Sequence, residues 1–196
     1  MPASRYCVSV PKPTQAELVA AKQKTLPDHL RSGLDVVFCG INPGLYSAAI
    51  GHHFGRPGNR FWKALHAAGF TPRVFSPCED AALLELGLGI TNIVSRATAR
   101  AEELSRAELV SGAEALRDKV VRYRPRFLAV VGFSAYRMAF ERPKAQGGLQ
   151  PEGIDATRIW LLPNTSGLNA HHQPQELKAR FEELRVAANV IDARRR

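Results

Sequence analysis

Four short runs of strand character alternate with segments of helical spacing, and this alternation constrains the fold more than any other feature of the chain. The runs are too short for helices and rich in β-branched and aromatic residues, as strands buried on both faces are. They are Val36–Cys39, Gly89–Val94, Phe127–Val131 and Ile159–Leu162. Strands that alternate with helices predict a mainly parallel sheet covered on both faces. We therefore expect an α/β fold, a three-layer α/β/α sandwich around a sheet of four to five strands.

The expected helices lie before, between and after these strands. They are Thr14–Lys24, Arg60–Ala68, Asp80–Glu85, Ala107–Tyr123, Ala135–Phe140 and Pro174–Val190. Glycine and proline punctuate Gly44–Gly58 and Arg142–Gly153, which we expect to be loops. With 196 residues and no convincing linker, residues 1–196 should form one domain. It would have a core at about 33–187, a helical extension at 14–24 and a basic tail at 192–196.

The composition constrains the function less than the strand pattern constrains the fold. A net charge of +9 draws polyanions, but basic charge also serves solubility, so alone it favours a nucleic-acid partner only modestly. No apolar run approaches the roughly 18 residues of a membrane span. The first 13 residues lack the apolar core of a signal peptide. We expect a cytoplasmic protein that does not associate with membranes.

Nucleotide, cofactor and metal chemistry are not indicated. The chain has no Gly-x-Gly-x-x-Gly after its first strand, no Gly-x-x-x-x-Gly-Lys loop and no Gly-x-Ser-x-Gly elbow. Cys7, Cys39 and Cys78 lack the paired spacing of a zinc or iron–sulfur site. Two adjacent histidine pairs, 52–53 and 171–172, are unlike metal ligands, although a composite site from both pairs is an open alternative. We expect no cofactor and no metal.

Two of the expected strands end in polar turns. Gly40-Ile41-Asn42-Pro43-Gly44 follows the first strand. Pro43 fixes its own φ and biases Asn42 toward extended conformations, so an amide is held where open α/β sheets place ligands. Asn164-Thr165-Ser166-Gly167-Leu168-Asn169 follows the fourth strand. Leu168 either packs back onto the core or forms an exposed wedge of the kind that unstacks DNA bases.

Together with Asn59-Arg60-Phe61-Trp62, these turns resemble the motifs of the uracil-DNA glycosylase superfamily. The branch of mismatch-specific uracil/thymine-DNA glycosylases is the most similar, and the resemblance spans about residues 33–187. It implies a DNA repair enzyme that flips uracil mispaired with guanine out of the duplex and hydrolyses its glycosidic bond. The expected partner is double-stranded DNA with G·U or related mismatches, and the expected state is a monomer.

The resemblance also implies roles for individual residues. The asparagine at the position of Asn42 orients the attacking water in the family. The base pocket would comprise Gly40, Ile41, Pro43, Gly44, Leu45, Ser47, Phe54 and Asn164. Phe54 would stack on the flipped base, with core packing as its alternative role. Ser166, Gly167, Leu168 and Asn169 would wedge the DNA and read the orphaned guanine, and Arg60, Asn92 and His171 are further candidate DNA contacts.

The departures from the family pattern shape the expected chemistry. The uracil-specific branch has an aspartate in place of Asn42, so we expect a slower catalyst. It also has a tyrosine in place of Gly44 that excludes the 5-methyl group of thymine, so we expect ethenocytosine, and thymine as a further candidate, to be accepted. The commoner bacterial form has proline in place of Thr165, and Ser-Arg at 169–170. Three alternatives stay open: an additional catalytic carboxylate, a lesion sensor without activity, and an enzyme of free nucleosides.

Overall fold

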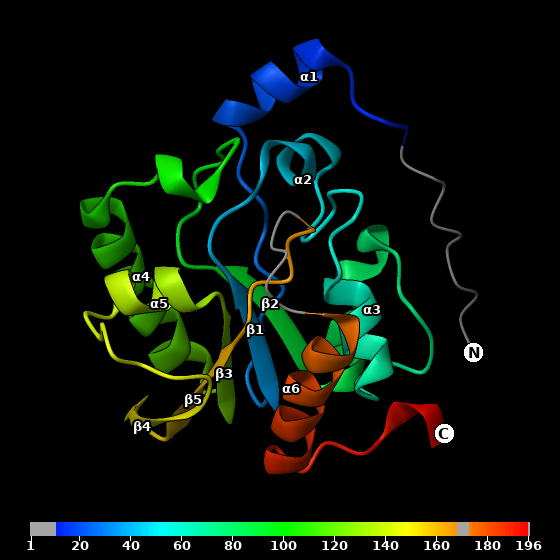
Figure 1. Ribbon diagram of the computed structural model, residues 1–196, viewed down its shortest axis with the longest axis vertical. Helices are drawn as coiled ribbons and strands as arrows, with labels where there is room; N and C mark the ends of the chain where they lie inside the picture. The colour runs from blue at the N-terminus through cyan, green and yellow to red at the C-terminus, as the bar shows by residue number, and fades with distance from the viewer. Residues whose placement is uncertain (1–10, 168–172, 196) are drawn as a thin grey trace.

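A five-stranded sheet forms the centre of the computed structural model, which describes residues 11–167 and 173–195 (Figure 1). Its strands are β1 (Val36–Gly40), β2 (Leu88–Asn92), β3 (Phe127–Val131), β4 (Gly148–Ile154) and β5 (Thr157–Leu162). They lie in the order β2-β1-β3-β5-β4, and every neighbouring pair is parallel except β4 and β5. The expected α/β fold with a mainly parallel central sheet is confirmed.

Helices cover both faces of this sheet. The helices of the described residues are α1 (Gln15–Ala20), α2 (Leu45–Ile50), α3 (Phe61–Ala67), α4 (Arg106–Tyr123), α5 (Phe133–Ala139) and α6 (Pro174–Ala187), with 3₁₀ segments η1 (Ala21–Gln23), η2 (Pro77–Leu86), η3 (Ala101–Glu103) and η4 (Ala193–Arg195). Helices α4 and α5 lie on one face, and α3 and α6 on the other (Figure 1). Because successive strand residues point to opposite faces, Phe38 joins the cluster with α3 and α6 while Val37 joins the other.

Two elements differ from the sequence expectation. Helix α2 occupies part of the expected loop Gly44–Gly58, where Ala48 packs with Ala21 of η1. A helix of six residues is too short to show an apolar repeat. Strand β4 occupies part of the other expected loop, as an edge strand with exposed Pro151 and a shift of register against β5. Edge strands tolerate proline and irregular pairing, so β4 lacks the apolar alternation that identifies a strand.

The other expected elements are present, with their boundaries shifted. The helix expected at Asp80–Glu85 is part of η2, and the one expected at Thr14–Lys24 is divided into α1 and η1. Strand β2 begins and ends before the expected run Gly89–Val94 does. Across residues 11–167 and 173–195, no helix combines the length and apolar character that a membrane crossing requires.

The strand order creates a switch point at one end of the sheet. The chain passes from β1 to β2 on one side of β1 and then crosses to β3 on the other side. At such a switch point the connections leave in opposite directions, and α/β proteins bind ligands there, outside the carboxyl ends of the strands. The turn after β1 leads into α2 at this end, and the orange segment after β5 rises toward it (Figure 1). The two polar turns therefore share one end of the sheet.

Candidate active site

Backbone hydrogen bonds fix the turn after β1. The carbonyls of Gly40, Ile41 and Pro43 accept hydrogen bonds from N–H groups of segment 93–98, at 2.9 to 3.1 Å. The Thr98 carbonyl in return accepts from the N–H that begins α2, at 3.1 Å. The turn is therefore held along its whole length by the chain that follows β2.

The amide of Asn42 has one orientation in this turn. Its Nδ2 donates to the Arg96 carbonyl at 2.8 Å and to Thr98 Oγ1 at 2.7 Å. A carbonyl can only accept, and Thr98 Oγ1 uses its single hydrogen on the Arg100 carbonyl at 2.8 Å. Both neighbours therefore require the nitrogen of the amide. The Asn42 Oδ1 remains as an acceptor, which suits a group that orients water.

Sequence reasoning missed Thr98. It lies in an irregular segment, is 2% exposed, and forms an isolated bridge with Gly44. No motif marks a threonine at this distance from the strand. Only the pairing of segment 93–98 along the turn after β1 brings its hydroxyl to Asn42.

Gly40, Asn92 and Phe54 meet at the end of β1. A Cβ at Gly40 would lie 2.4 Å from Asn92 Oδ1 and 3.4 Å from the Phe54 ring, so the close approach requires glycine. Phe54 has a φ of 50°, a left-handed conformation that costs an aromatic residue free energy. Its ring stacks on Phe61 with centroids 3.9 Å apart. One face of the half-buried Phe54 ring thus packs on the core through Phe61.

Two further pocket candidates differ in what surrounds them. Ser47 is 5% exposed, and its Oγ accepts from the Gly55 N–H at 3.0 Å, which ties α2 to the loop that carries Phe54. Gly44 has a φ of −70°, and no described atom lies within 4 Å of a Cβ built on it. The space beside Gly44 is therefore open to a larger side chain or a larger base.

Three histidines surround the buried carboxylate of Asp80 behind this pocket. Asp80 is 2% exposed and lies 3.2 Å from His29 Nε2 and from His52 Nδ1, and it accepts from the His53 N–H at 3.0 Å. Burial alone would raise the pKa of Asp80, but these hydrogen bonds and the histidine charges bring that pKa below its usual value. Within the described ranges, no three His, Cys, Asp or Glu side chains are arranged to hold a metal ion.

The second turn is bound to the start of α3. Asn164 Oδ1 accepts from the Ser166 N–H at 2.9 Å, which closes the turn locally. The Arg60 N–H donates to the Thr165 carbonyl at 3.0 Å, and its guanidinium donates to the Ser166 carbonyl at 3.1 Å. Arg60, a candidate DNA contact, therefore holds this turn in place. Asn59 Oδ1 accepts from the Phe61 N–H, the first of α3, at 3.0 Å.

The two loops of the candidate site also touch directly. A Cβ at Gly167 would lie 2.6 Å from the Gly58 carbonyl oxygen, so Gly167 sets how closely the second turn approaches the loop before α3. Between the turns, Gly132 after β3 has a φ of 139° and faces Ile41, whose Cδ1 would lie 3.1 Å from a Cβ there. Leu168, Asn169 and His171 lie outside the described residues.

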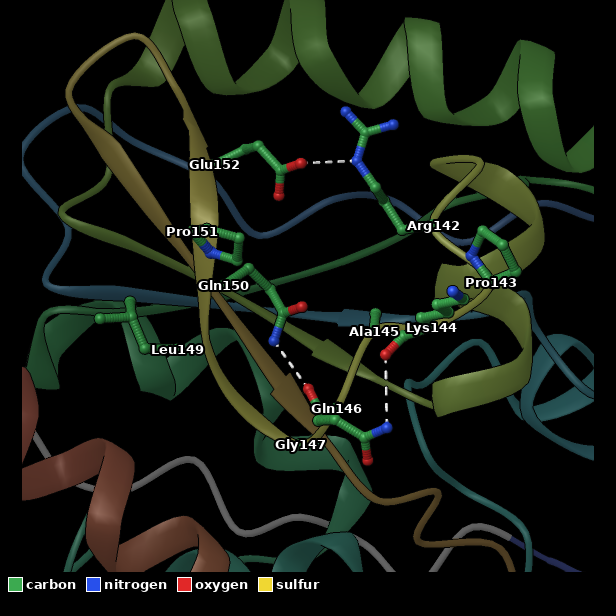
Figure 2. A pocket seen from close by; sticks show the side chains of 10 residues that line it. All are labelled: Arg142, Pro143, Lys144, Ala145, Gln146, Gly147, Leu149, Gln150, Pro151 and Glu152. Carbon is green, nitrogen blue, oxygen red and sulfur yellow. Dashed lines mark hydrogen bonds and ion pairs between the residues drawn. The ribbon is translucent and has the colours of Figure 1, made fainter.

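A separate hollow of about 450 Å³ lies at the edge strand β4 (Figure 2). Residues 142–147 and β4 line it, and Arg142 Nε forms an ion pair with Glu152 at 2.6 Å across it. The Gln150 side chain donates to the carbonyls of Gln146 and Gly148 at 2.8 Å each. None of the candidate site residues borders this hollow.

Comparison with known proteins bears on the family and the fold of this chain. The family model described as "Uracil DNA glycosylase superfamily" matches residues 27–185. The fold is similar to the solution NMR structure of a candidate uracil DNA glycosylase from Methanosarcina acetivorans, with a TM-score of 0.55 and 19% sequence identity. The match covers 83% of this chain and 98% of that one. At this identity the likeness shows a shared fold.

Proposed function

This chain belongs to the uracil DNA glycosylase superfamily, and from that premise we propose that it is a monofunctional, mismatch-specific glycosylase. It flips uracil mispaired with guanine out of double-stranded DNA and releases it by hydrolysis, leaving an abasic site. The observation that carries the proposal is the orientation of Asn42. Both of its amide N–H groups are committed to fixed acceptors, so its Oδ1 is presented as an acceptor at the carboxyl end of β1.

The chemistry follows from what an amide can do. Asn42 Oδ1 accepts a hydrogen bond from water and turns a water lone pair toward the anomeric carbon, but an amide is too weak a base to remove a proton early. The bond between the anomeric carbon and the base nitrogen therefore breaks largely first, and its electron pair leaves with the base. Water then bonds to the cationic sugar and loses one proton to solvent, and the departed base anion takes up one proton. Donors near the base oxygens lower the barrier, because negative charge develops there.

The pocket for the flipped base lies between Phe54 and Asn92. The base stacks on the face of Phe54 opposite Phe61, because Phe61 occupies the other face. The glycine at position 40 lets Asn92 approach the end of β1, so that its amide meets the base edge. The open space beside Gly44 accommodates substituents at the 5-position, which is why ethenocytosine and thymine are proposed as further substrates.

The second turn acts on the duplex. Leu168 fills the gap left by the flipped base, and backbone groups around Gly167 and Asn169 read the orphaned guanine. Arg60 and the contact between Gly58 and Gly167 hold the start of this turn. The net charge of +9 attracts the phosphate backbone of the proposed partner, G·U or related mismatched DNA, which a monomer binds.

A labelled G·U duplex followed by alkaline cleavage of abasic sites tests the proposal. We expect product at equimolar enzyme, with less from A·U duplex and from single-stranded uracil. Asn42→Ala should lose base release by orders of magnitude and still bind the mismatched duplex. Tight binding without base release by the natural protein would identify a lesion sensor instead. Faster hydrolysis of uridine than of uracil in DNA would identify a nucleoside enzyme.

A further inference from the structure

We propose that His53 is a positioning residue, which fixes the orientation of the Asn92 amide so that the pocket reads uracil and rejects cytosine. This inference rests on the proposed function, because it requires a flipped base beside Asn92. A preference for bases opposite guanine does not explain why cytosine is left in place. An enzyme that reads the orphaned guanine meets guanine opposite cytosine at every normal G·C pair, so the base itself has to be discriminated.

The surroundings of His53 determine which ring nitrogen carries the hydrogen. Nε2 lies 2.9 Å from the Pro27 carbonyl oxygen, which can only accept, so Nε2 is the donor. Nδ1 of a neutral ring is then an acceptor. The ring is 2% exposed, and burial lowers the pKa of His53 despite the opposing effects of the Pro27 carbonyl and Asp80. The neutral tautomer with an acceptor at Nδ1 is therefore the stable form at neutral pH.

This acceptor decides how the Asn92 amide is oriented. Asn92 Nδ2 lies 3.3 Å from His53 Nδ1 and donates to it. The Asn92 Oδ1 is consequently directed to the end of β1, where a Cβ at Gly40 would lie 2.4 Å from it. Rotating the amide by half a turn would place Oδ1 against the lone pair of Nδ1. In that arrangement the hydrogen bond between Asn92 and His53 is lost, and the two acceptors Oδ1 and Nδ1 face each other.

The imidazole is itself held on both sides. The backbone N–H of His53 donates to Asp80 Oδ2 at 3.0 Å. The segment that supplies the Pro27 carbonyl is fixed to β2, because His29 and Ile90 exchange backbone hydrogen bonds at 3.0 and 3.1 Å. Asp28 in the same segment accepts from the Thr91 hydroxyl at 2.6 Å and pairs with Lys119 at 2.6 Å. Turning the ring away from Asn92 would break the hydrogen bond from Nε2 to the Pro27 carbonyl, whose segment is fixed to β2.

The fixed amide matches one base edge and not the other. Uracil offers an N3–H donor beside an O4 acceptor, and cytosine offers an N3 acceptor beside an N4–H donor. Oδ1 of Asn92 can accept from the uracil N3–H, and the second Nδ2 hydrogen can donate to O4. Against cytosine, the Oδ1 acceptor would face the N3 acceptor, and the Nδ2 donor would face the N4–H donor. Cytosine would be read only by the rotated amide, which His53 disfavours.

Two substitutions separate the roles of the two ring nitrogens. The amide nitrogen of His53→Gln can take the position of Nε2 and keep the Pro27 contact, but it removes the acceptor beside Asn92. The amide oxygen of His53→Asn can take the position of Nδ1 and keep that acceptor. His52→Gln is the matched control, because the His52 ring contacts Asp80 and not Asn92. Two single-turnover rates are measured for each variant. One is the release of uracil from G·U duplex, and the other is the release of cytosine from G·C duplex of the same sequence.

We expect the ratio of cytosine to uracil release to rise at least about tenfold in His53→Gln, the size of effect that one misplaced buried hydrogen bond produces. His53→Asn and His52→Gln should keep the ratio of the natural protein. An unchanged ratio in a folded His53→Gln variant, or a raised ratio in His53→Asn, would overturn the proposal. If the natural protein releases no uracil, the proposed function fails separately. Long-range ¹H–¹⁵N spectra of the free protein then decide the inference, since a hydrogen on Nδ1 of His53 would contradict it.

Discussion

Thr98 Oγ1 lies 2.7 Å from Asn42 Nδ2 and donates its own hydrogen to the Arg100 carbonyl, so the hydroxyl can serve Asn42 only as an acceptor. The side chain that presents an acceptor to water is thus oriented by a residue 56 positions later in the chain.

Removing the Thr98 hydroxyl should slow catalysis without weakening DNA binding. Thr98→Val keeps the shape of the buried side chain but leaves one Asn42 N–H with no acceptor there, so Oδ1 is less firmly oriented. We expect the single-turnover rate on G·U duplex to fall about tenfold or more, with the dissociation constant for duplex unchanged. Thr98→Ser, which restores the acceptor, should recover most of the rate. A rate loss that Ser fails to restore would indicate a packing role for Thr98.

A carboxylate at position 42 should not improve this enzyme. Asn42→Asp would place an oxygen where the Arg96 carbonyl now accepts from Nδ2 at 2.8 Å, so two acceptors would face each other. The added anion favours a cationic sugar, but the side chain would leave its present orientation. We expect slower uracil release than in the natural protein, measured at neutral pH under single-turnover conditions. Faster release would show that the Arg96 contact is dispensable.

A tyrosine at Gly44 should narrow the substrate range. The backbone there is extended, with φ −70° and ψ 153°, and no described atom within 4 Å obstructs a Cβ, so Gly44→Tyr should fold normally. The ring would fill the space that a 5-methyl or etheno substituent uses. Release of thymine or ethenocytosine should fall at least about tenfold relative to uracil. Gly44→Ala, which adds a single carbon, is the control and should preserve the ratio.

A side chain at Gly167 should impair action on duplex DNA. Its Cβ would lie 2.6 Å from the Gly58 carbonyl oxygen, so Gly167→Ala has to displace the second turn. If this turn wedges the duplex, we expect release from G·U duplex to fall severalfold more than release from single-stranded uracil, which needs no wedge. Comparing the two substrates at subsaturating enzyme checks this. Equal losses on both would place the effect in the base pocket.

Acid should switch off uracil release through His53. Burial lowers the pKa of this ring from its ordinary 6.5, with Asp80 and Asp28 acting to raise it and His29 to lower it. The ring therefore stays neutral above that lowered pKa. Activity should be lost only as the pH falls through it, because protonated Nδ1 becomes a donor and the Asn92 amide has to rotate. The rate on G·U duplex against pH measures this, and His53→Asn should remove that part of the acid decline.

The sequence alone determined the elements whose signals are local. Buried parallel strands are mostly apolar or β-branched, so β1, β3 and β5 stand out by their apolar runs and β2 by its β-branched residues. The polar turns after β1 and β5 mark their own positions. Neither β4 nor α2 carries such a signal. The pairing of β4 with β5 and the packing of Ala48 beside Ala21 create them.

Contacts between distant segments of the chain set how the candidate residues are oriented. An asparagine amide has no preferred orientation of its own. The sequence therefore places an amide in the turn after β1 but does not tell which of its atoms is left to bind a ligand. Thr98 determines that for Asn42, and His53 with Pro27 determines it for Asn92. These partners lie far away in the sequence from the residues they orient. The hydrogen bonds that orient the amides form only when the folded sheet brings donor and acceptor together.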